Sequence, residues 1–227
     1  MRRLLEQLRM RFTSPAFGGM RIEGPCFVLG SAPSALWPDR RFAGWTILTV
    51  NAAQAIAPAP GSAPDITLMS GQMLGNEPVN LEAKRVLRGR STGELWLIER
   101  GISAAAAAEL LRAMDFTYQA LRLITPRLRS RITYRQLGVD ASAGSGEQKI
   151  STGTFAALLA LEQGASSVVL SGLSLSDAGH AYNQLGHKRY HLNSDRSALR
   201  VAIERGLPIY TICQAFSQAS GIPLWNG

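Results

Sequence analysis

The sequence predicts an α/β protein whose main domain is a single Rossmann-like, mostly parallel, doubly wound sheet. Short apolar runs that fit buried strands alternate with longer segments that fit helices, and this alternation is typical of parallel sheets with helices on both faces. The chain has 227 residues, of which 46% are hydrophobic, enough for one good-sized core. We therefore expect one domain over 21–227, preceded by a separate N-terminal segment over 1–20.

The N-terminal segment is basic and amphipathic. Within residues 1–13, arginines surround four apolar side chains that share one helical face: Leu4, Leu5, Leu8 and Phe12. Two interpretations follow from this pattern. The helix docks on its own domain or on a second copy of the chain, which would make a homo-oligomer, or it lies on an anionic membrane surface.

The strands are predicted from apolar runs that stop at glycines or polar residues, and the helices from apolar periodicity between small-residue starts and glycine stops. The predicted strands are 26–30, 45–51, 65–70, 95–99, 166–172 and 208–213. The predicted helical segments are a long stretch within 103–124, a helix over 152–164, and a helix over 194–206 with Ser194 as its N-cap. The segment 140–149 is expected to be a small-residue loop.

Charge and cysteine usage narrow the function classes. The formal net charge is +8, which fits either a solvated basic surface or an anionic partner. The arginines do not alternate with aromatic residues as they do on single-strand-binding surfaces, so a phosphorylated substrate or a membrane is favoured over nucleic acid. Cys26 and Cys213 belong to no CxxC pair, and we expect both to be buried thiols in a reducing compartment.

The cellular location is predicted from two kinds of apolar segment that the sequence lacks. It contains no run of about 18 apolar residues that would make a transmembrane helix, and its N-terminus lacks the apolar core of a signal peptide. The chain is therefore expected in the cytoplasm, at the inner face of the cytoplasmic membrane if its N-terminal helix binds lipid.

Polar and small residues gather where the predicted strands end. Because ligands of open α/β sheets lie beyond the carboxyl ends of the strands, the loop that opens with Gly30 and Ser31 is a candidate ligand site, although it does not match GxGxxG. The second predicted strand ends at Asn51, 21 positions after Gly30. Asn51 is either a turn residue or a partner of a ribose hydroxyl.

A second group of candidates lies in the C-terminal half. Ser151, Thr152 and Gly153 open a helix whose first amides have no internal partners, so they form either a simple N-cap or an anion site. The loop after the strand at 166–172 contains Tyr182, and His187 and His191 follow it. Histidine is the usual general base near neutral pH, although each histidine here could equally be a surface residue of a polar loop.

In this order, the motifs resemble a known family. "VLGSAPSA", "TVNAAQ", "ISTGTFAALLALEQGASSVVLSGLSL", a tyrosine and "HLNSD" are similar to the bacterial sialyltransferases of glycosyltransferase family 42 and their uncharacterised relatives. The resemblance covers residues 26–51 and 148–220 best. It implies a Rossmann-like domain of GT-A variant type, a CMP-activated sugar donor, inversion at the anomeric carbon and no metal cofactor. The sequence agrees on the metal, because no two aspartates are spaced as DxD.

The resemblance also implies roles for single residues. Those implied to bind the donor are Gly30, Ser31 and Ala32 along the nucleotide, Asn51 at the ribose or cytosine, Ser151, Thr152 and Gly153 at the donor carboxylate and ribose, and Gly172, Leu173 and Ser174 at the cytosine. Tyr182 would donate to the leaving phosphate, and His191, or His187 in another alignment, would be the catalytic base. The family pairs two tyrosines on this phosphate, whereas the first position here is Ser176.

Three functions therefore compete. The first is a glycosyltransferase that uses CMP-sialic acid, CMP-Kdo or a related donor to modify a cell-surface glycan or glycolipid such as lipopolysaccharide. The second is an ATP- and magnesium-dependent enzyme, because archaeal pterin pyrophosphokinases share a similar "GSAPS" opening. The third is a non-catalytic relative that keeps only nucleotide binding. The sequence favours the first, because few acidic residues follow the predicted strands as magnesium ligands would.

Overall fold

A computed structural model describes residues 17–57, 62–99, 101–141, 149–176, 179–183, 185 and 190–227. Most of the N-terminal segment over 1–20 lies outside these residues, as does His187. The predicted roles of that segment and of His187 therefore stay predictions.

One seven-stranded sheet organises the molecule, in the order β5-β4-β3-β2-β1-β6-β7. All neighbouring strands in it are parallel, so the predicted α/β class is confirmed. The strands are β1 (Cys26–Leu29), β2 (Thr46–Val50), β3 (Ile66–Ser70), β4 (Ser91–Ile98), β5 (Thr117–Ile124), β6 (Val168–Ser171) and β7 (Ile209–Thr211). The six predicted strands are all present, with ends that differ by a few residues.

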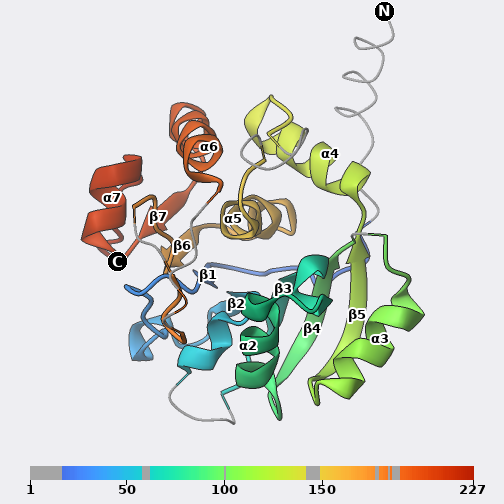
Figure 1. The fold of residues 1–227 in the computed structure, drawn as a ribbon. Coiled ribbons are helices and arrows are strands. Elements are labelled where there is room, and N and C mark those ends of the chain that lie inside the picture. Colours follow the sequence, from blue (N-terminus) through green and yellow to red (C-terminus); the bar gives the residue numbers. More distant parts are fainter. Residues whose placement is uncertain are drawn as a thin grey trace, which may run out of the picture.

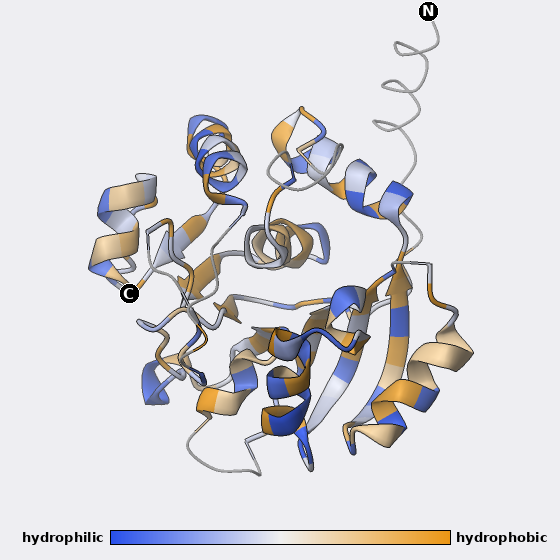
Figure 2. Ribbon diagram, in the orientation of Figure 1, coloured by the Kyte–Doolittle hydropathy of each residue, from blue (hydrophilic) through white to orange (hydrophobic). Residues whose placement is uncertain are grey.

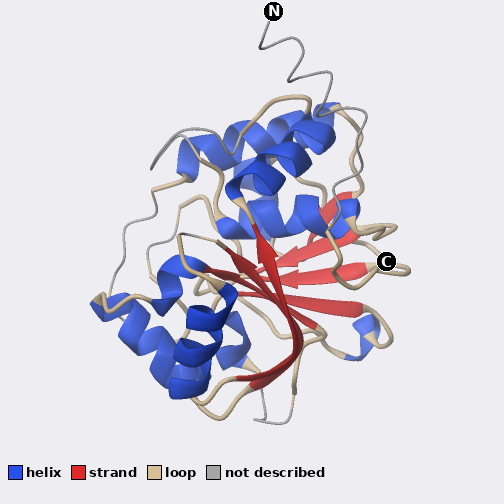
Figure 3. Cartoon of the chain, turned by 90° about the vertical axis from the view of Figure 1, so that its right-hand side faces the viewer, coloured by secondary structure: helices blue, strands red, loops and turns tan. Residues whose placement is uncertain are grey.

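Helices cover both faces of the sheet (Figures 1 and 3). They are α2 (Pro78–Leu87), α3 (Ala104–Ala113), α4 (Pro126–Leu137), α5 (Thr152–Glu162), α6 (Leu192–Glu204) and α7 (Gln214–Ser220), with 3-10 turns η1 (Arg40–Phe42), η2 (Ala53–Ile56) and η3 (Gly71–Leu74). Residues of α4, α5, α6 and α7 share one core with β1, β2 and β6. On the other face, α2 and α3 pack against β3 and β4.

The centre of the fold is the pair β1 and α5. Both are buried almost throughout, from Cys26 to Leu29 and from Gly153 to Ala160, and Figure 2 shows α5 as the most uniformly hydrophobic of the helices around it. A strand buried on both faces reads as a continuous apolar run rather than an alternation. This is why the sequence predicts both elements well, and it gives the site that follows them a rigid base.

The segment 103–124 is not one helical stretch. Helix α3 ends at Ala113, Asp115 adopts a left-handed φ of 55°, and the chain continues as β5. Edge strand β5 pairs with β4 alone, and most of its side chains stay partly or fully exposed. The sequence predicts a helix here because β5 contains residues that favour helices, such as Ala120 and Leu121. The segment is a strand because it pairs with β4, and strand formation depends on tertiary pairing more than on local propensity.

Helix α6 begins earlier than predicted. His191, not Ser194, occupies the N-cap position. Ser194 lies in the first turn, where its hydroxyl donates to the carbonyl of Lys149 at 2.6 Å and lies 3.1 Å from that of His191. The two glycine stops are confirmed, since Gly164 and Gly206 follow their helices with φ of 106° and 66°.

Both cysteines carry free thiols, with Cys26 fully buried and Cys213 half-buried. Burial raises the pKa of the Cys26 thiol to about 12, so this group stays protonated and unreactive near neutral pH. Within the part of the chain that the structure describes, no helix is long and apolar enough to cross a bilayer.

Candidate active site

A cavity of about 260 Å³ lies beyond the carboxyl ends of β1, β2, β3 and β6. The chain leaves β1 toward β2 on one side and returns later to β6 on the other side. This reversal of direction is the topological switch point, where open α/β sheets bind their ligands. The position of the cavity thus follows from strand order alone.

Two glycines bring the loops after β1 and β6 together. The amide of Gly30 donates to the carbonyl of Ser171, and the amide of Ala32 donates to that of Gly172, each at 2.8 Å. A Cβ on either glycine would collide with the carbonyl oxygen of the other, and Gly172 also has a φ of 66°. Both positions therefore require glycine for backbone packing, in addition to any contact with a ligand.

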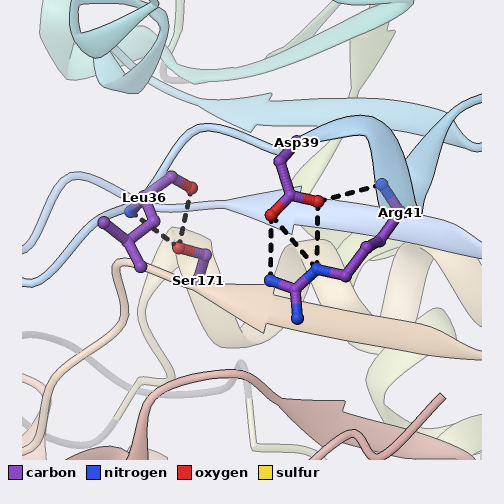
Figure 4. A network of polar contacts seen from close by, with 4 residues as sticks. All are labelled: Leu36, Asp39, Arg41 and Ser171. Atoms are coloured by element: carbon purple, nitrogen blue, oxygen red, sulfur yellow. Dashed lines mark hydrogen bonds and ion pairs between the residues drawn. The ribbon is translucent and has the colours of Figure 1, made fainter.

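The β1 loop is fastened further along its length (Figure 4). The hydroxyl of Ser171 accepts from the amide of Leu36 and donates to its carbonyl, both at 2.9 Å. Farther along, Asp39 caps η1 and pairs with the exposed Arg41 at 2.9 Å. The loop is therefore anchored on β6 before it reaches the surface.

Asn51 is a turn residue that also lines the cavity. It occupies the left-handed region with a φ of 53°, as a turn residue does. Its Oδ1 accepts from the amide of Ser70 at 2.8 Å, and the residue also lines the cavity. Because Oδ1 is occupied, the side-chain amide group is the part of Asn51 that can donate to a ligand.

The N-terminus of α5 faces the same cavity. Ser151 is the N-cap, and its hydroxyl accepts from the amide of Thr154 at 3.1 Å. The amides of Thr152 and Gly153 find no acceptor among the residues that the structure describes. Two backbone donors at the positive end of a helix dipole suit an anionic group.

The buried carboxylate of Asp195 stabilises the first turn of α5. Asp195 accepts from the amide of Ser151 at 2.7 Å and is 7% exposed. Burial raises the pKa of Asp195 above its ordinary value, while hydrogen bonds from Ser151 and Thr154 and the nearby His191 oppose the rise. Asp195 thereby ties the start of α6 to the start of α5.

His191 lines the cavity from the N-cap of α6. Its Nδ1 lies 2.7 Å from the carbonyl oxygen of Lys149. A carbonyl can only accept, so Nδ1 carries the proton and Nε2 of the neutral ring keeps its lone pair. This tautomer is the one that a general base requires when it acts through Nε2.

His180 is a second histidine that lines the cavity, and no role was predicted for it from the sequence. Its Nδ1 lies 2.8 Å from the hydroxyl oxygen of Ser31, and its ring stacks on that of Tyr182 at 5.1 Å with planes 5° apart. Tyr182 itself packs against the hydrophobic core of α2 and α3. Burial, and then the charge of Glu82, raise the pKa of the Tyr182 phenol to about 12, while a hydrogen bond with Ser31 lowers it.

The structure brings most of the predicted site residues together. The predicted residues that line the cavity are Gly30, Ser31, Asn51, Ser151, Thr152, Gly153, Gly172, Leu173, Ser174 and His191. Ala32 is fully buried, and neither Ala32 nor Tyr182 is among the lining residues. Within the described residues, no group of three or more His, Cys, Asp or Glu side chains gathers as metal ligands.

Several lining residues were missed by sequence reasoning. Gln72 and Met73 follow β3, so the strand-end argument applied to Asn51 would have found them. Asn80 reaches the cavity from α2, and Phe216 from α7. No local sequence signal marks these two, because only the packing of their helices brings them to the site.

Comparisons with known proteins find similarity in three-dimensional structure but not in sequence. No family model matches the chain, and no curated protein matches it. Among solved structures, the sialyltransferase CstII from Campylobacter jejuni with the substrate analogue CMP-3FNeuAc has a TM-score of 0.54 at 14% identity, over 90% of this chain and 86% of that chain.

Two further structures agree. A structure of CST-II with a trisaccharide acceptor and CMP has a TM-score of 0.52 at 14% identity, covering 89% of this chain and 86% of that one. The monofunctional α-2,3-sialyltransferase Cst-I from Campylobacter jejuni has a TM-score of 0.53 at 10% identity, covering 89% and 80%. The predicted resemblance to bacterial sialyltransferases is confirmed at the level of the fold.

Proposed function

We propose that this chain is an inverting, metal-independent glycosyltransferase that uses a CMP-activated sugar. The observation that carries the proposal is His191, which lines the same switch-point cavity as Thr152 and Gly153, whose amides have no acceptor among the residues that the structure describes. A base and an anion-binding helix end are the two devices that transfer from a nucleotide donor requires. The fold shared with structures that contain CMP and CMP-3FNeuAc supports the choice of nucleotide.

In the proposed reaction, Nε2 of His191 takes the proton of the acceptor hydroxyl. The acceptor oxygen forms a bond to the anomeric carbon while the bond from that carbon to the phosphate oxygen breaks, and the electron pair leaves with CMP. A positioned general base of this kind contributes about 10²–10⁴-fold to the rate. The predicted donation from Tyr182 to the leaving phosphate stays a prediction, because Tyr182 does not line the cavity.

The acceptor is proposed to be a cell-surface glycan or glycolipid such as lipopolysaccharide, and the donor sugar sialic acid, Kdo or a related nonulosonic acid. The net charge of +8 supports work close to an anionic membrane surface, to which residues 1–13 would attach the enzyme. In this proposal the chain works at the cytoplasmic side of the inner membrane.

The test is CMP release from CMP-sialic acid and from CMP-Kdo in the presence of EDTA, with deacylated lipopolysaccharide oligosaccharides as acceptors. We expect His191→Ala to lower transfer by about 10²-fold or more and to leave the affinity for CMP, measured by calorimetry, within about twofold. His187→Ala is the matched control and should retain transfer.

Other outcomes would separate the remaining functions. Transfer that survives in His191→Ala but not in His187→Ala would move the base to His187. CMP binding without turnover of either donor would indicate a non-catalytic relative. ATP binding that requires magnesium, with no CMP binding, would overturn the proposal in favour of the pyrophosphokinase-like enzyme.

A further inference from the structure

We propose that the groove between α2 and α3 binds the headgroup phosphate of an anionic phospholipid and so docks this face of the protein on a bilayer. The groove has a volume of about 370 Å³ and lies on the outer side of the two helices that cover β3 and β4 (Figure 1). The inference goes beyond the proposed function, which attaches the enzyme through residues 1–13 alone, and it does not depend on the reaction.

Spacing along each helix brings the lining residues of the groove to one side. The stripe on α2 has the i, i+3, i+4, i+7 spacing of a single helical face and consists of Leu81, Lys84, Arg85 and Arg88. The facing stripe, along α3 and its C-cap, consists of Leu110, Ala113 and Met114. Leu81 and Leu110 are 52% and 40% exposed. The groove therefore combines uncovered apolar side chains with three cations, and Figure 2 shows hydrophilic and hydrophobic residues mixed along both helices.

The charge of the groove is positive and only partly neutralised. Arg85 pairs with Glu82 at 2.7 Å. Lys84 has no acidic partner among the described residues, and its Nζ donates to the carbonyl of Leu74 at 2.9 Å. The guanidinium of Arg88 makes no ion pair or hydrogen bond with any residue that the structure describes. Because no described carboxylate lines the groove, an anion is the complementary partner.

Other occupants of the groove fit less well than a bilayer. The segment 1–13 contains four arginines and one acid, Glu6, so like charges would oppose its docking there. A second copy of the chain, paired groove to groove, would place the same cations against each other. No described aromatic side chain lines the groove for base stacking. A bilayer offers phosphates to the cations and an acyl boundary to the leucines.

The groove adjoins the candidate active site through α2. Asn80 lines the active-site cavity, and Leu81, the next residue, lines the groove. The contact of Lys84 with Leu74 links the groove to η3, which also contains the cavity residue Met73. Docking of this face would therefore hold the cavity close to the membrane surface, where a lipid-linked acceptor lies.

The test is flotation of the full chain with two kinds of vesicle, phosphatidylcholine alone and equal parts of phosphatidylcholine and phosphatidylglycerol. We expect binding to the anionic vesicles alone, and we expect it to weaken as salt is added. A cation near an anionic lipid surface contributes about fivefold to partitioning. Arg85→Gln combined with Arg88→Gln should therefore weaken partitioning about tenfold to thirtyfold. Leu81→Gln combined with Leu110→Gln should weaken it about threefold or more, because the apolar contact is lost.

The matched control removes the same charge from the opposite face of the sheet. Arg196 and Arg200 are exposed on α6, and Arg200 pairs with Glu204 as Arg85 pairs with Glu82. Arg196→Gln combined with Arg200→Gln should leave partitioning within about twofold, since charges far from the bilayer are screened. Unfolding midpoints of both double variants check that neither substitution disturbs the fold.

Three outcomes would overturn the inference. Equal losses in the α2 and α6 double variants would show general attraction by net charge. Partitioning that is unchanged in the α2 double variant would assign vesicle binding to residues 1–13 alone. Binding to poly-glutamate but not to the anionic vesicles would indicate an acidic protein partner instead of a lipid.

The failure of this inference is distinguishable from failure of the proposed function, because vesicle binding requires neither nucleotide nor acceptor. If the wild-type protein binds no CMP and transfers no sugar, the proposed function is wrong, and the vesicle results still decide the inference. If transfer occurs and the α2 double variant binds vesicles as the wild type does, the inference alone is wrong.

Discussion

The two described histidines of the cavity have opposite surroundings. His191, at the start of α6, gives its Nδ1 proton to the backbone carbonyl of Lys149 and keeps a lone pair on Nε2. His180, in the turn after β6, meets a hydroxyl at Nδ1 instead, and a hydroxyl can donate where a carbonyl cannot. The group at Nδ1 therefore fixes the tautomer of the neutral His191 ring, whereas a hydroxyl is compatible with either tautomer of His180.

The two positions also differ in how they are held. His191 depends on α6 and on the contact between Asp195 and the first turn of α5. His180 depends on the β1 loop, through Ser31 and the amide of Ala181. Because these supports come from different parts of the chain, a change to one of them should affect one histidine and spare the other.

The largest effect should come from the same substitution at both positions. Glutamine offers an N–H donor but cannot take up a proton near neutral pH. His191→Gln should therefore lower transfer by about 10²–10⁴-fold, whereas His180→Gln should retain it within about tenfold. Steady-state CMP release from the active donor measures both. Equal losses in the two variants would show that the histidines do not have distinct roles.

A second prediction concerns a substitution that should disturb the β1 loop, which holds His180, and leave the surroundings of His191 unchanged. Gly172→Ala places a Cβ against the carbonyl of Gly30 at a φ of 66°. We expect a loss of about 1–2 kcal/mol from the left-handed backbone, and a further loss of about 1–3 kcal/mol from the collision. Denaturant unfolding measures the total loss.

Gly206→Ala is the matched control for this prediction. Gly206 has the same φ of 66°, but a Cβ there would meet nothing within 4 Å. Gly206→Ala should therefore show only the loss of stability that comes from the left-handed backbone. In Gly172→Ala, the ¹⁵N shifts of His180 should change while those of His191 stay as in the wild type. Equal destabilisation by the two substitutions would contradict the close approach of the β1 and β6 loops.

The sequence anticipates those parts of the site whose position follows from local pattern. Gly30, Asn51 and Ser151 come directly after strands or before a helix, so the strand-end rule places them without any knowledge of packing. The buried strands β1 and β6 are also predicted well from the sequence, because a strand covered on both faces is apolar throughout.

The rest depends on tertiary contacts that leave no local signal. The edge strand β5 contains helix-forming residues and exists through its pairing with β4. The choice between His180 and Tyr182 as the cavity residue is similar, since both lie in one short turn. The hydroxyl of Ser31, 149 positions away in the sequence, holds the histidine at the cavity, and the core of α2 and α3 takes the tyrosine.

The smallest expected effect is on the pH dependence of stability. Its direction is determined by Asp195, which links the start of α6, where His191 lies, to the start of α5. Burial raises the pKa of Asp195 above its ordinary value of 3.8, so above that pH the native protein binds more protons than the unfolded chain. The free energy of unfolding should therefore fall as the pH rises from about 4 toward 7. Asp195→Asn keeps an acceptor for the Ser151 amide and should lack this part of the slope.

Asp39→Asn supplies a control of opposite sign. Hydrogen bonds from Arg41 hold the pKa of the exposed Asp39 below its ordinary value, so its contribution to stability is lost as the pH falls through that lower pKa, and a surface pair of this kind contributes little. Denaturant unfolding of the three proteins at several pH values makes the comparison. If Asp195→Asn followed the wild-type pH dependence, burial would not be raising the pKa of Asp195.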